Sequence, residues 1–324
     1  MQRQLTFGGG VSPRNTRLRG QSIIEYVLII AVIGLVIVFA GPGVAGAIRN
    51  QFNLVGNTLN SGTNGGTEGG GASGGGSTGA DSATVQAAIA KDAKDWTLDE
   101  QKAVAEDIAK NGTSSIAYAK AKAAMDAGTE FTMKLTNGKT LTYRIIGIGH
   151  DDLADGSGKA GITFEATNDA MGKQCMNSTG TNAGGWEKCE LRGRLNTGDL
   201  WSLLPAELQS KVKAVTKMTD NKGGDSDITA TATTDKVFLV STTEVYGNIH
   251  YSNGQFDGTQ YEYYKSKGVS DTMNYSGASS SWKHWTRSVD EMANHAHFRC
   301  VHYNGFWETT YMGSTFCVFP AWCF

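Results

Sequence analysis

The side chains best suited to chemistry or binding gather near the C-terminus, in the stretch NHAHFRCVHYNGFWETTY at residues 294–311. Two histidines one residue apart could suggest a metal site, but no paired carboxylate lies near them, so we expect a surface strand without metal. Alternate side chains of a strand share a face. A strand here would place polar residues on one face and apolar residues on the other: His295, His297 and Arg299 against Ala296, Phe298 and Cys300.

This stretch allows two interpretations. The apolar face can pack into the core while the polar face forms an exposed strand edge. Alternatively, the segment is a binding surface, because Trp, Tyr, His, Asn and Phe on loops suit the recognition of carbohydrate or protein. The candidate ligand-binding residues are His295, His297, Arg299, Tyr303, Asn304, Phe306, Trp307 and Tyr311.

The chain has five cysteines and no CxxC pair, so it carries no zinc signature. Cys175 and Cys189 lie on either side of a glycine-rich turn, and in an exported chain they are the pair that we expect to form a disulfide. The odd number leaves at least one thiol free or paired between chains. Burial as free thiols is the alternative.

The sequence motifs for metal binding and catalysis in the rest of the chain are weak. Residues 151–158 (DDLADGSG) have the composition of a calcium loop but not the spacing or the terminal Glu of an EF-hand, so we expect a polar loop, with Ca²⁺ left open as a cofactor. There is no phosphate-binding loop or nucleophile elbow, and we expect no enzymatic activity. The formal net charge of -2 gives no reason to expect a nucleic-acid partner.

At the other end of the chain, a basic leader precedes an apolar segment. Residues 1–20 hold four arginines and no acidic residue, and residues 23–40 are apolar apart from Glu25, Tyr26 and Gly34. With its flanks this segment can span a hydrocarbon core of about 30 Å, and the arginines place its start in the cytoplasm and the bulk of the chain outside. A cleaved secretory signal and an ordinary single-pass anchor are alternatives. The anchor does not explain the glutamate, because a carboxylate in an apolar helix is costly.

The sequence RG-QSIIEY at residues 19–26 resembles the processing site of Flp-type prepilins, the small type IV pilins of the Tad (tight adherence) system. The resemblance implies that a membrane prepilin peptidase cuts between Gly20 and Gln21, and that Glu25 and Tyr26 serve assembly with other pilin subunits. Cleavage creates an α-amino group at Gln21. That group can pair with Glu25 of a neighbouring subunit and offset the desolvation of both charges.

A glycine-rich linker and a helical segment follow. Residues 61–80 hold ten glycines in twenty positions, which predicts a flexible tether with a mean reach of about 25 Å. Residues 81–128 predict short helices, because apolar residues recur at helical spacing and Thr97 with Glu100 forms a capping box. We expect these helices to pack on one another or on the next domain.

From about residue 130 the hydrophobic period becomes that of strands. Residues 131–149 alternate around Asn137-Gly138, which predicts a β-hairpin. Two helices separated by a break at residues 196–198 follow, and then a buried strand that leads into a short helix at residues 235–247. These elements predict a mixed α+β domain.

The segments GGWEKCELRGRLN, DKVFLVSTTEVYG and WTRSV resemble a family of bacterial surface domains without assigned activity. Its fold is similar to that of C-type lectins and formylglycine-generating enzymes. The resemblance covers nearly all of residues 130–324 and implies a C-type-lectin-like α+β head. Formylglycine-generating activity would need a reactive cysteine pair, such as Cys300 with Cys317 or Cys323, and no motif supports one.

The sequence therefore predicts five parts in order: a prepilin leader (1–20), a pilin-like transmembrane helix (21–60), a Gly-rich linker (61–80), a helical spacer (81–128) and a C-type-lectin-like surface domain (129–324). We expect a pilin-like subunit with an adhesin-like head. It would enter the inner membrane through residues 23–40 and then reach the cell surface or a pilus. Its partners would be the prepilin peptidase, other pilin subunits, and a glycan or protein on a host or bacterial surface.

The sequence is also compatible with three alternatives. The first is a single-pass membrane-anchored surface receptor that is never built into a pilus. The second is a display domain whose C-terminal region is hypervariable, since lectin-like folds serve as such scaffolds. The third, and most remote, is an enzyme of the formylglycine-generating type.

Overall fold

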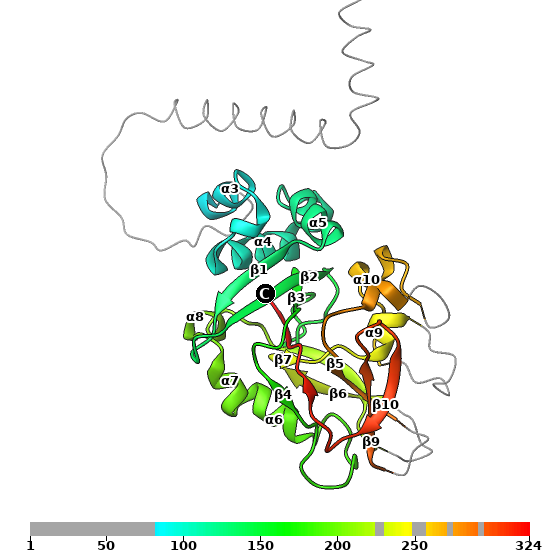
Figure 1. Ribbon diagram of the computed structural model, residues 1–324. Helices are drawn as coiled ribbons and strands as arrows, with labels where there is room; N and C mark the ends of the chain where they lie inside the picture. Colours follow the sequence, from blue (N-terminus) through cyan, green and yellow to red (C-terminus); the bar gives the residue numbers. More distant parts are fainter. Residues whose placement is uncertain (1–81, 224–229, 248–256, 271–274, 291–294) are drawn as a thin grey trace, which may run out of the picture. The chain divides into compact units, whose positions relative to one another are not determined.

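The computed structural model describes residues 82–223, 230–247, 257–270, 275–290 and 295–324 (Figure 1). These residues belong to one compact unit, Gly74–Phe324. The expected leader, hydrophobic helix and linker at residues 1–80 lie outside the described residues. Within the described part, no helix is both long enough and apolar enough to cross a membrane. The mixed α and β architecture predicted for the C-terminal part is confirmed.

One five-stranded sheet has the strand order β1-β2-β3-β12-β7. Its strands are β1 (Glu130–Lys134), β2 (Thr140–Ile148), β3 (Ile162–Ala166), β7 (Val237–Phe238) and β12 (Ala321–Cys323). β1 and β2 form the antiparallel hairpin predicted around Asn137-Gly138, with Gly138 at φ 81°. β12 lies between β3 and β7, so the last residues of the chain are held in the middle of this sheet.

A second five-stranded sheet has the order β10-β9-β8-β11-β4. It consists of β4 (Lys173–Gln174), β8 (His284–Val289), β9 (His297–Val301), β10 (Trp307–Tyr311) and β11 (Phe316–Cys317). β9 and β10 are antiparallel, and β10 lies at the edge of the sheet. A separate pair is formed by β5 (Val215–Asp220) and β6 (Ala230–Asp235).

Three helices open the described chain: α3 (Ala83–Ile89), α4 (Leu98–Asn111) and α5 (Tyr118–Ala127), with 3-10 turns at Ala93–Asp95 and Gly112–Ser114. The predicted capping box is confirmed. The Thr97 hydroxyl accepts from the N–H of Glu100, and the Glu100 carboxylate accepts from the N–H of Thr97. α5 ends where Gly128 adopts the left-handed conformation, at φ 67°.

These helices share one hydrophobic core with the sheets. α4 lies so close to the start of β3 that a Cβ on Gly161 would fall 1.8 Å from the carbonyl oxygen of Ala105. The side-chain amide of Gln101 in α4 also donates to the hydroxyl of Tyr143 in β2, at 3.0 Å. The expected boundary between residues 128 and 129 therefore divides helices from strands, but it does not divide one core from another.

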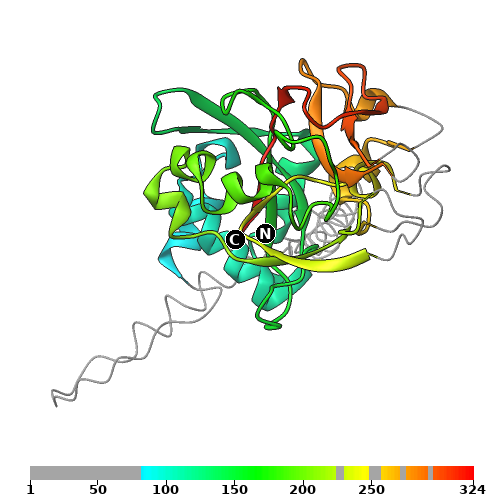
Figure 2. The same cartoon turned by 90° about the horizontal axis from the view of Figure 1, so that it is seen from below.

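The remaining helices connect the strands. They are α6 (Glu190–Asn196), α7 (Asp199–Leu203), α8 (Ala206–Gln209), α9 (Thr242–Tyr246) and α10 (Glu262–Ser266), with a 3-10 turn at Tyr275–Ala278. The predicted break between two helices at residues 196–198 is confirmed. Both views show the β9–β10 hairpin at the end of the unit remote from α3 (Figures 1 and 2).

Candidate functional site

Exposed large hydrophobic side chains concentrate on the β9–β10 hairpin. Among the described residues, this class consists of Met218, Tyr303, Phe306 and Tyr311, and the last three belong to the hairpin. Tyr303 is 60% exposed, the highest value of the four. A cluster of exposed aromatic side chains on a soluble domain is typical of a binding surface. We call Tyr303, Phe306, Trp307 and Tyr311 the aromatic hairpin.

The tip of the aromatic hairpin is held by several hydrogen bonds. The N–H of His302 donates to the carbonyl of Phe306 at 2.7 Å, and the N–H of Gly305 donates to the carbonyl of His302 at 2.8 Å. Gly305 has φ 86°, a conformation that glycine adopts without strain. Asn304 Oδ1 accepts from the N–H of Phe306 at 3.0 Å, and the Tyr246 hydroxyl donates to the Gly305 carbonyl at 2.6 Å. The exposed rings of Tyr303 and Phe306 therefore stand on a hydrogen-bonded turn, which limits the entropy lost when a ligand binds.

The strand face expected to carry three polar residues is different in the structure. His295 precedes β9 and has φ 53°, so it is not part of the strand. Arg299 is 2% exposed, with its guanidinium 5.1 Å from the centroid of the Trp307 ring. The prediction of one exposed face shared by His295, His297 and Arg299 was wrong, because the aromatic side chains of β10 help to cover the positions that face them on β9.

The eight candidate ligand-binding residues fall into three groups. The exposed ones are His295, Tyr303, Asn304, Phe306 and Tyr311, the half-buried ones are His297 and Trp307, and the buried one is Arg299. His297 lies opposite Tyr311 in the strand register, and their rings meet edge to face at 6.4 Å. The structure thus brings the aromatic candidates together on one hairpin and removes Arg299 from the accessible set.

A second group of polar side chains lies in the core, and no pattern in the sequence indicated it. Lys217 Nζ is 2.6 Å from both Asp151 Oδ1 and Glu244 Oε1. Arg287 donates two hydrogen bonds to the Glu244 carboxylate, at 2.5 and 2.9 Å. All four side chains are at most 3% exposed. We call Asp151, Lys217, Glu244 and Arg287 the buried ion cluster. Its two positive and two negative charges balance, and it joins elements of the fold instead of facing a ligand.

The loop at residues 151–158 does not fit the Ca²⁺ that the sequence left open. Asp151 belongs to the buried ion cluster, and Asp152 pairs with Lys159 at 2.9 Å. Asp155 accepts from the Ser157 hydroxyl at 2.6 Å. The carboxylates thus serve separate partners, whereas a calcium site needs several oxygens around one point. No group of three His, Cys, Asp or Glu side chains in the described ranges is placed to hold a metal ion.

The predicted disulfide between Cys175 and Cys189 was wrong, because all five cysteines are free thiols. The Cys189 thiol instead donates to the carbonyl of Met176, at 3.1 Å. Burial raises the pKa of the Cys189 and Cys300 thiols to about 12. Since the thiolate is the reactive form, these two side chains behave as small apolar groups of the core.

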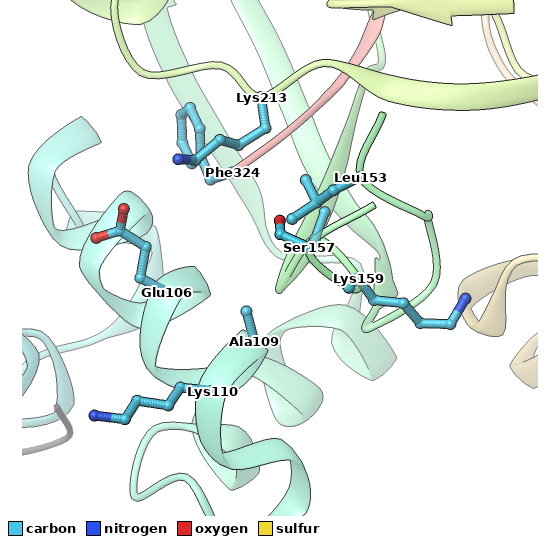
Figure 3. Close-up of a pocket in the computed structure, with 10 residues that line it drawn as sticks. Glu106, Ala109, Lys110, Leu153, Ser157, Lys159, Lys213 and Phe324 are labelled. Carbon is cyan, nitrogen blue, oxygen red and sulfur yellow. The ribbon is translucent and has the colours of Figure 1, made fainter. Parts of the chain in front are cut away.

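A cavity of about 290 Å³ lies between α4 and the loop before β3. Leu153 and Phe324 supply apolar lining, and Glu106 is among the charged lining residues. Figure 3 shows the ammonium groups of Lys110 and Lys159 pointing in opposite directions, away from the other labelled side chains. Because its polar groups do not converge, this cavity is a weaker candidate for ligand binding than the aromatic hairpin.

Residues 159–323 match one family model, described as "Domain of unknown function (DUF6273)". The match covers 165 of the 324 residues, including both strands of the aromatic hairpin. Comparison with curated proteins and with solved structures finds no match.

Proposed function

The chain belongs to the DUF6273 family, and we propose that it is a surface-displayed Flp/type IV pilin-like subunit whose α+β head binds a ligand through the aromatic hairpin. The observation that carries the binding role is that three of the four exposed large hydrophobic side chains among the described residues, Tyr303, Phe306 and Tyr311, belong to one hairpin. Leaving these apolar side chains accessible to water is costly, and a partner that covers them removes this cost. The C-type-lectin-like character of the head is part of the same proposal.

The position of the aromatic hairpin suits this role. The described chain begins at residue 82, directly before α3 and after the tether expected at residues 61–80, and the hairpin lies at the end of the described unit remote from α3 (Figures 1 and 2). A ligand on another surface would therefore meet the hairpin before it met the attachment point. The rings also sit on a turn that Tyr246 and Asn304 hold in place.

The pilin role rests on the sequence alone. The leader, the Gly20-Gln21 junction, Glu25 and Tyr26, and the apolar run at residues 23–40 occur together in the order of an Flp-type prepilin. In this proposal, prepilin peptidase removes the leader and Glu25 pairs with the new α-amino group of a neighbouring subunit. The head then lies on the outer side of the membrane or along a pilus.

Two measurements test the pilin role. N-terminal sequencing of the mature protein should give Gln21 as the first residue, and a start at Met1 would leave the single-pass receptor as the better proposal. Glu25→Ala should still be cleaved but should not enter filaments. Normal incorporation of that variant would refute the pairing assigned to Glu25.

A matched pair of variants tests the binding role. Tyr303→Ser with Phe306→Ser should weaken binding to glycan arrays and to intact cells by about tenfold or more, because exposed aromatic anchors dominate such interfaces. Met218→Ser is the control, since Met218 is 40% exposed on β5, close to the 43% of Phe306. Equal losses in both variants would point to a general effect and would refute a specific role of the hairpin.

The raised pKa values of the buried thiols argue against the formylglycine-generating alternative. That chemistry needs a reactive cysteine pair, whereas Cys300 is 0% exposed and burial raises its pKa to about 12. Cys323 is equally buried, and burial raises its pKa well above the ordinary value. We therefore propose a non-enzymatic binding protein.

A further inference from the structure

β10 is an edge strand whose outer backbone groups can be assigned. Among the described strands, only β9 lies beside it. The N–H of His302 donates to Phe306, and the N–H of Met312 donates to Ala296, so the residues of β10 that bond to β9 have even numbers. In an antiparallel pair the residues between them direct their N–H and C=O groups outward. Thr309 and Tyr311 therefore present N–H donors along the outer edge.

The sequence of β10 does not protect this edge. Natural edge strands carry lysine, proline, bulges or very short lengths that prevent pairing with another chain. At the other end of this sheet, β4 has two residues and one of them is Lys173. β10 instead reads WETTY, with strand-forming residues and one charge. That charge, Glu308, forms an ion pair with Lys283, the residue directly before β8 of the same sheet.

The same five residues are complementary to themselves. If two copies of β10 lie antiparallel with Thr309 opposite Thr309, Trp307 faces Tyr311 and Glu308 faces Thr310. Threonine pairs and aromatic pairs are favourable across strands, and no two like charges meet. The outward donors of Thr309 and Tyr311 would then point at acceptors of the other copy. In any other register this match is lost, because Trp307 no longer lies opposite Tyr311 and Glu308 no longer lies opposite Thr310.

We infer that the partner of the aromatic hairpin is a second copy of this chain, joined to it edge to edge through β10 with Thr309 at the two-fold axis. This inference rests on the proposed function, because it names the ligand class of the same hairpin. The pairing joins two five-stranded sheets into one continuous sheet. Tyr303 and Phe306 flank the new strand pair and add apolar contact.

The pairing should be weak for a single pair of heads. One strand of five residues forms only about four to six backbone hydrogen bonds, and the buried area stays below the roughly 1,200 Å² of stable complexes. Many copies in one filament or on one cell raise the effective concentration and can multiply the overall affinity by about a hundredfold or more. Self-pairing of this kind joins neighbouring filaments or cells, not free monomers.

Cysteine trapping tests the geometry directly. In the full-length protein on cells, Thr309→Cys should give a disulfide-linked dimer on mild oxidation, because opposed residues lie about 5.5 Å apart between Cα atoms and disulfides accept about 4.4–6.8 Å. Thr132→Cys is the control, as Thr132 is also an exposed threonine on an edge strand, β1. A 309–309 peptide found by mass spectrometry supports the inference. No dimer above the control, or a link to a different protein, overturns it.

Introducing a charge at residue 309 gives a second, independent test. Cells that display Thr309→Asp alone or Thr309→Lys alone should lose at least about tenfold in aggregation, because like charges then face each other. A mixture of the two strains should recover, since opposite charges meet at the axis. Failure of the mixture to exceed either strain overturns the assignment of residue 309 to the axis.

These tests separate the inference from the proposed function. If Tyr303→Ser with Phe306→Ser abolishes binding to foreign surfaces while Thr309→Cys gives no dimer, self-pairing fails and the binding role stands. If Thr309→Cys gives the dimer in a protein whose mature N-terminus is Met1, self-pairing stands and the pilin role fails.

Discussion

Replacing Lys217 by methionine removes one of the two positive charges of the buried ion cluster and keeps most of the apolar stem of the side chain. Lys217 contacts Asp151 and Glu244, both at 2.6 Å. After the change Glu244 keeps Arg287, while Asp151 keeps neutral donors: the hydroxyls of Thr163 at 2.6 Å and Tyr261 at 2.9 Å and the thiol of Cys323 at 3.5 Å. Asp151 is then left without an ion pair, and His150 is the remaining charged group that favours its ionised form. Removing one partner of a buried pair costs about 3–5 kcal/mol, a large share of the roughly 5–15 kcal/mol that stabilises a domain.

The effect of Lys217→Met should depend on pH. Burial acts to raise the pKa of Asp151, but Lys217 and His150 outweigh it and hold that pKa below its ordinary value. In the wild type this carboxylate therefore stabilises the fold above pH of about 3.9, its unfolded pKa, and the contribution is lost as the pH falls. We expect that His150 and the Thr163 hydroxyl do not outweigh burial by themselves, so that without Lys217 the folded pKa of Asp151 rises above the unfolded one. The variant then loses stability as the pH increases, so its deficit relative to wild type should be larger at pH 7 than at pH 4.5.

Urea unfolding of Gly74–Phe324 at both pH values measures this difference. The control is Lys102→Met, which removes an exposed ion pair with Glu106 on α4 and should cost at most about 1 kcal/mol. Asp151→Asn combined with Lys217→Met should recover part of the loss, because the unpaired charge is gone. A deficit of Lys217→Met below about 1 kcal/mol at pH 7, or one that does not shrink at pH 4.5, would refute the role given to the cluster.

Two further substitutions test the packing of the head and the support of the hairpin. Gly161→Ala should destabilise the head by about 3 kcal/mol in urea unfolding, because its Cβ would overlap the backbone of α4, whereas Gly193→Ala in α6 has open space and should stabilise slightly. Equal stability of the two variants would show that α4 does not pack on β3 as described. Tyr246→Phe should cost about 1–2 kcal/mol and should speed hydrogen exchange at the tip, because the buried Gly305 carbonyl loses its donor. Tyr303→Phe is its exposed control, and unchanged exchange in Tyr246→Phe would mean that this hydrogen bond does not hold the turn.

Local sequence signals predicted the local elements well. The Asn137-Gly138 turn, the capping box at Thr97 and the helix break at residues 196–198 each depend on neighbours in the sequence, and each is confirmed. In these cases the physical cause of the element lies within a few residues of it. The leader and apolar segment at residues 1–60 show equally local patterns and remain predictions.

Features that depend on distant residues could not be predicted in this way. Asp151 and Asp152 are adjacent in sequence, yet one is buried against Lys217 and the other pairs with Lys159 on the surface. The composition of the segment predicted that Asp151 and Asp152 belong to one polar loop. Asp151 is buried because it pairs with Lys217, which lies more than sixty residues away in the sequence. The other side chains of the strand that contains Lys217 do not indicate this pairing. Arg299 is a similar case, because alternation along β9 assigns it to a face but cannot show that Trp307 packs against it.

The short helix α9 connects the stability of the core with the geometry of the candidate site. Glu244 caps this helix by accepting from the N–H of Ser241 at 3.0 Å, and the same carboxylate binds Lys217 and Arg287 in the buried ion cluster. Two residues later, Tyr246 donates to the carbonyl of Gly305 at the hairpin tip. A shift of Glu244 would therefore move the hydroxyl that holds the turn. The buried charges thus do more than join the sheets, because through one helical turn they fix the support on which the exposed aromatic rings stand.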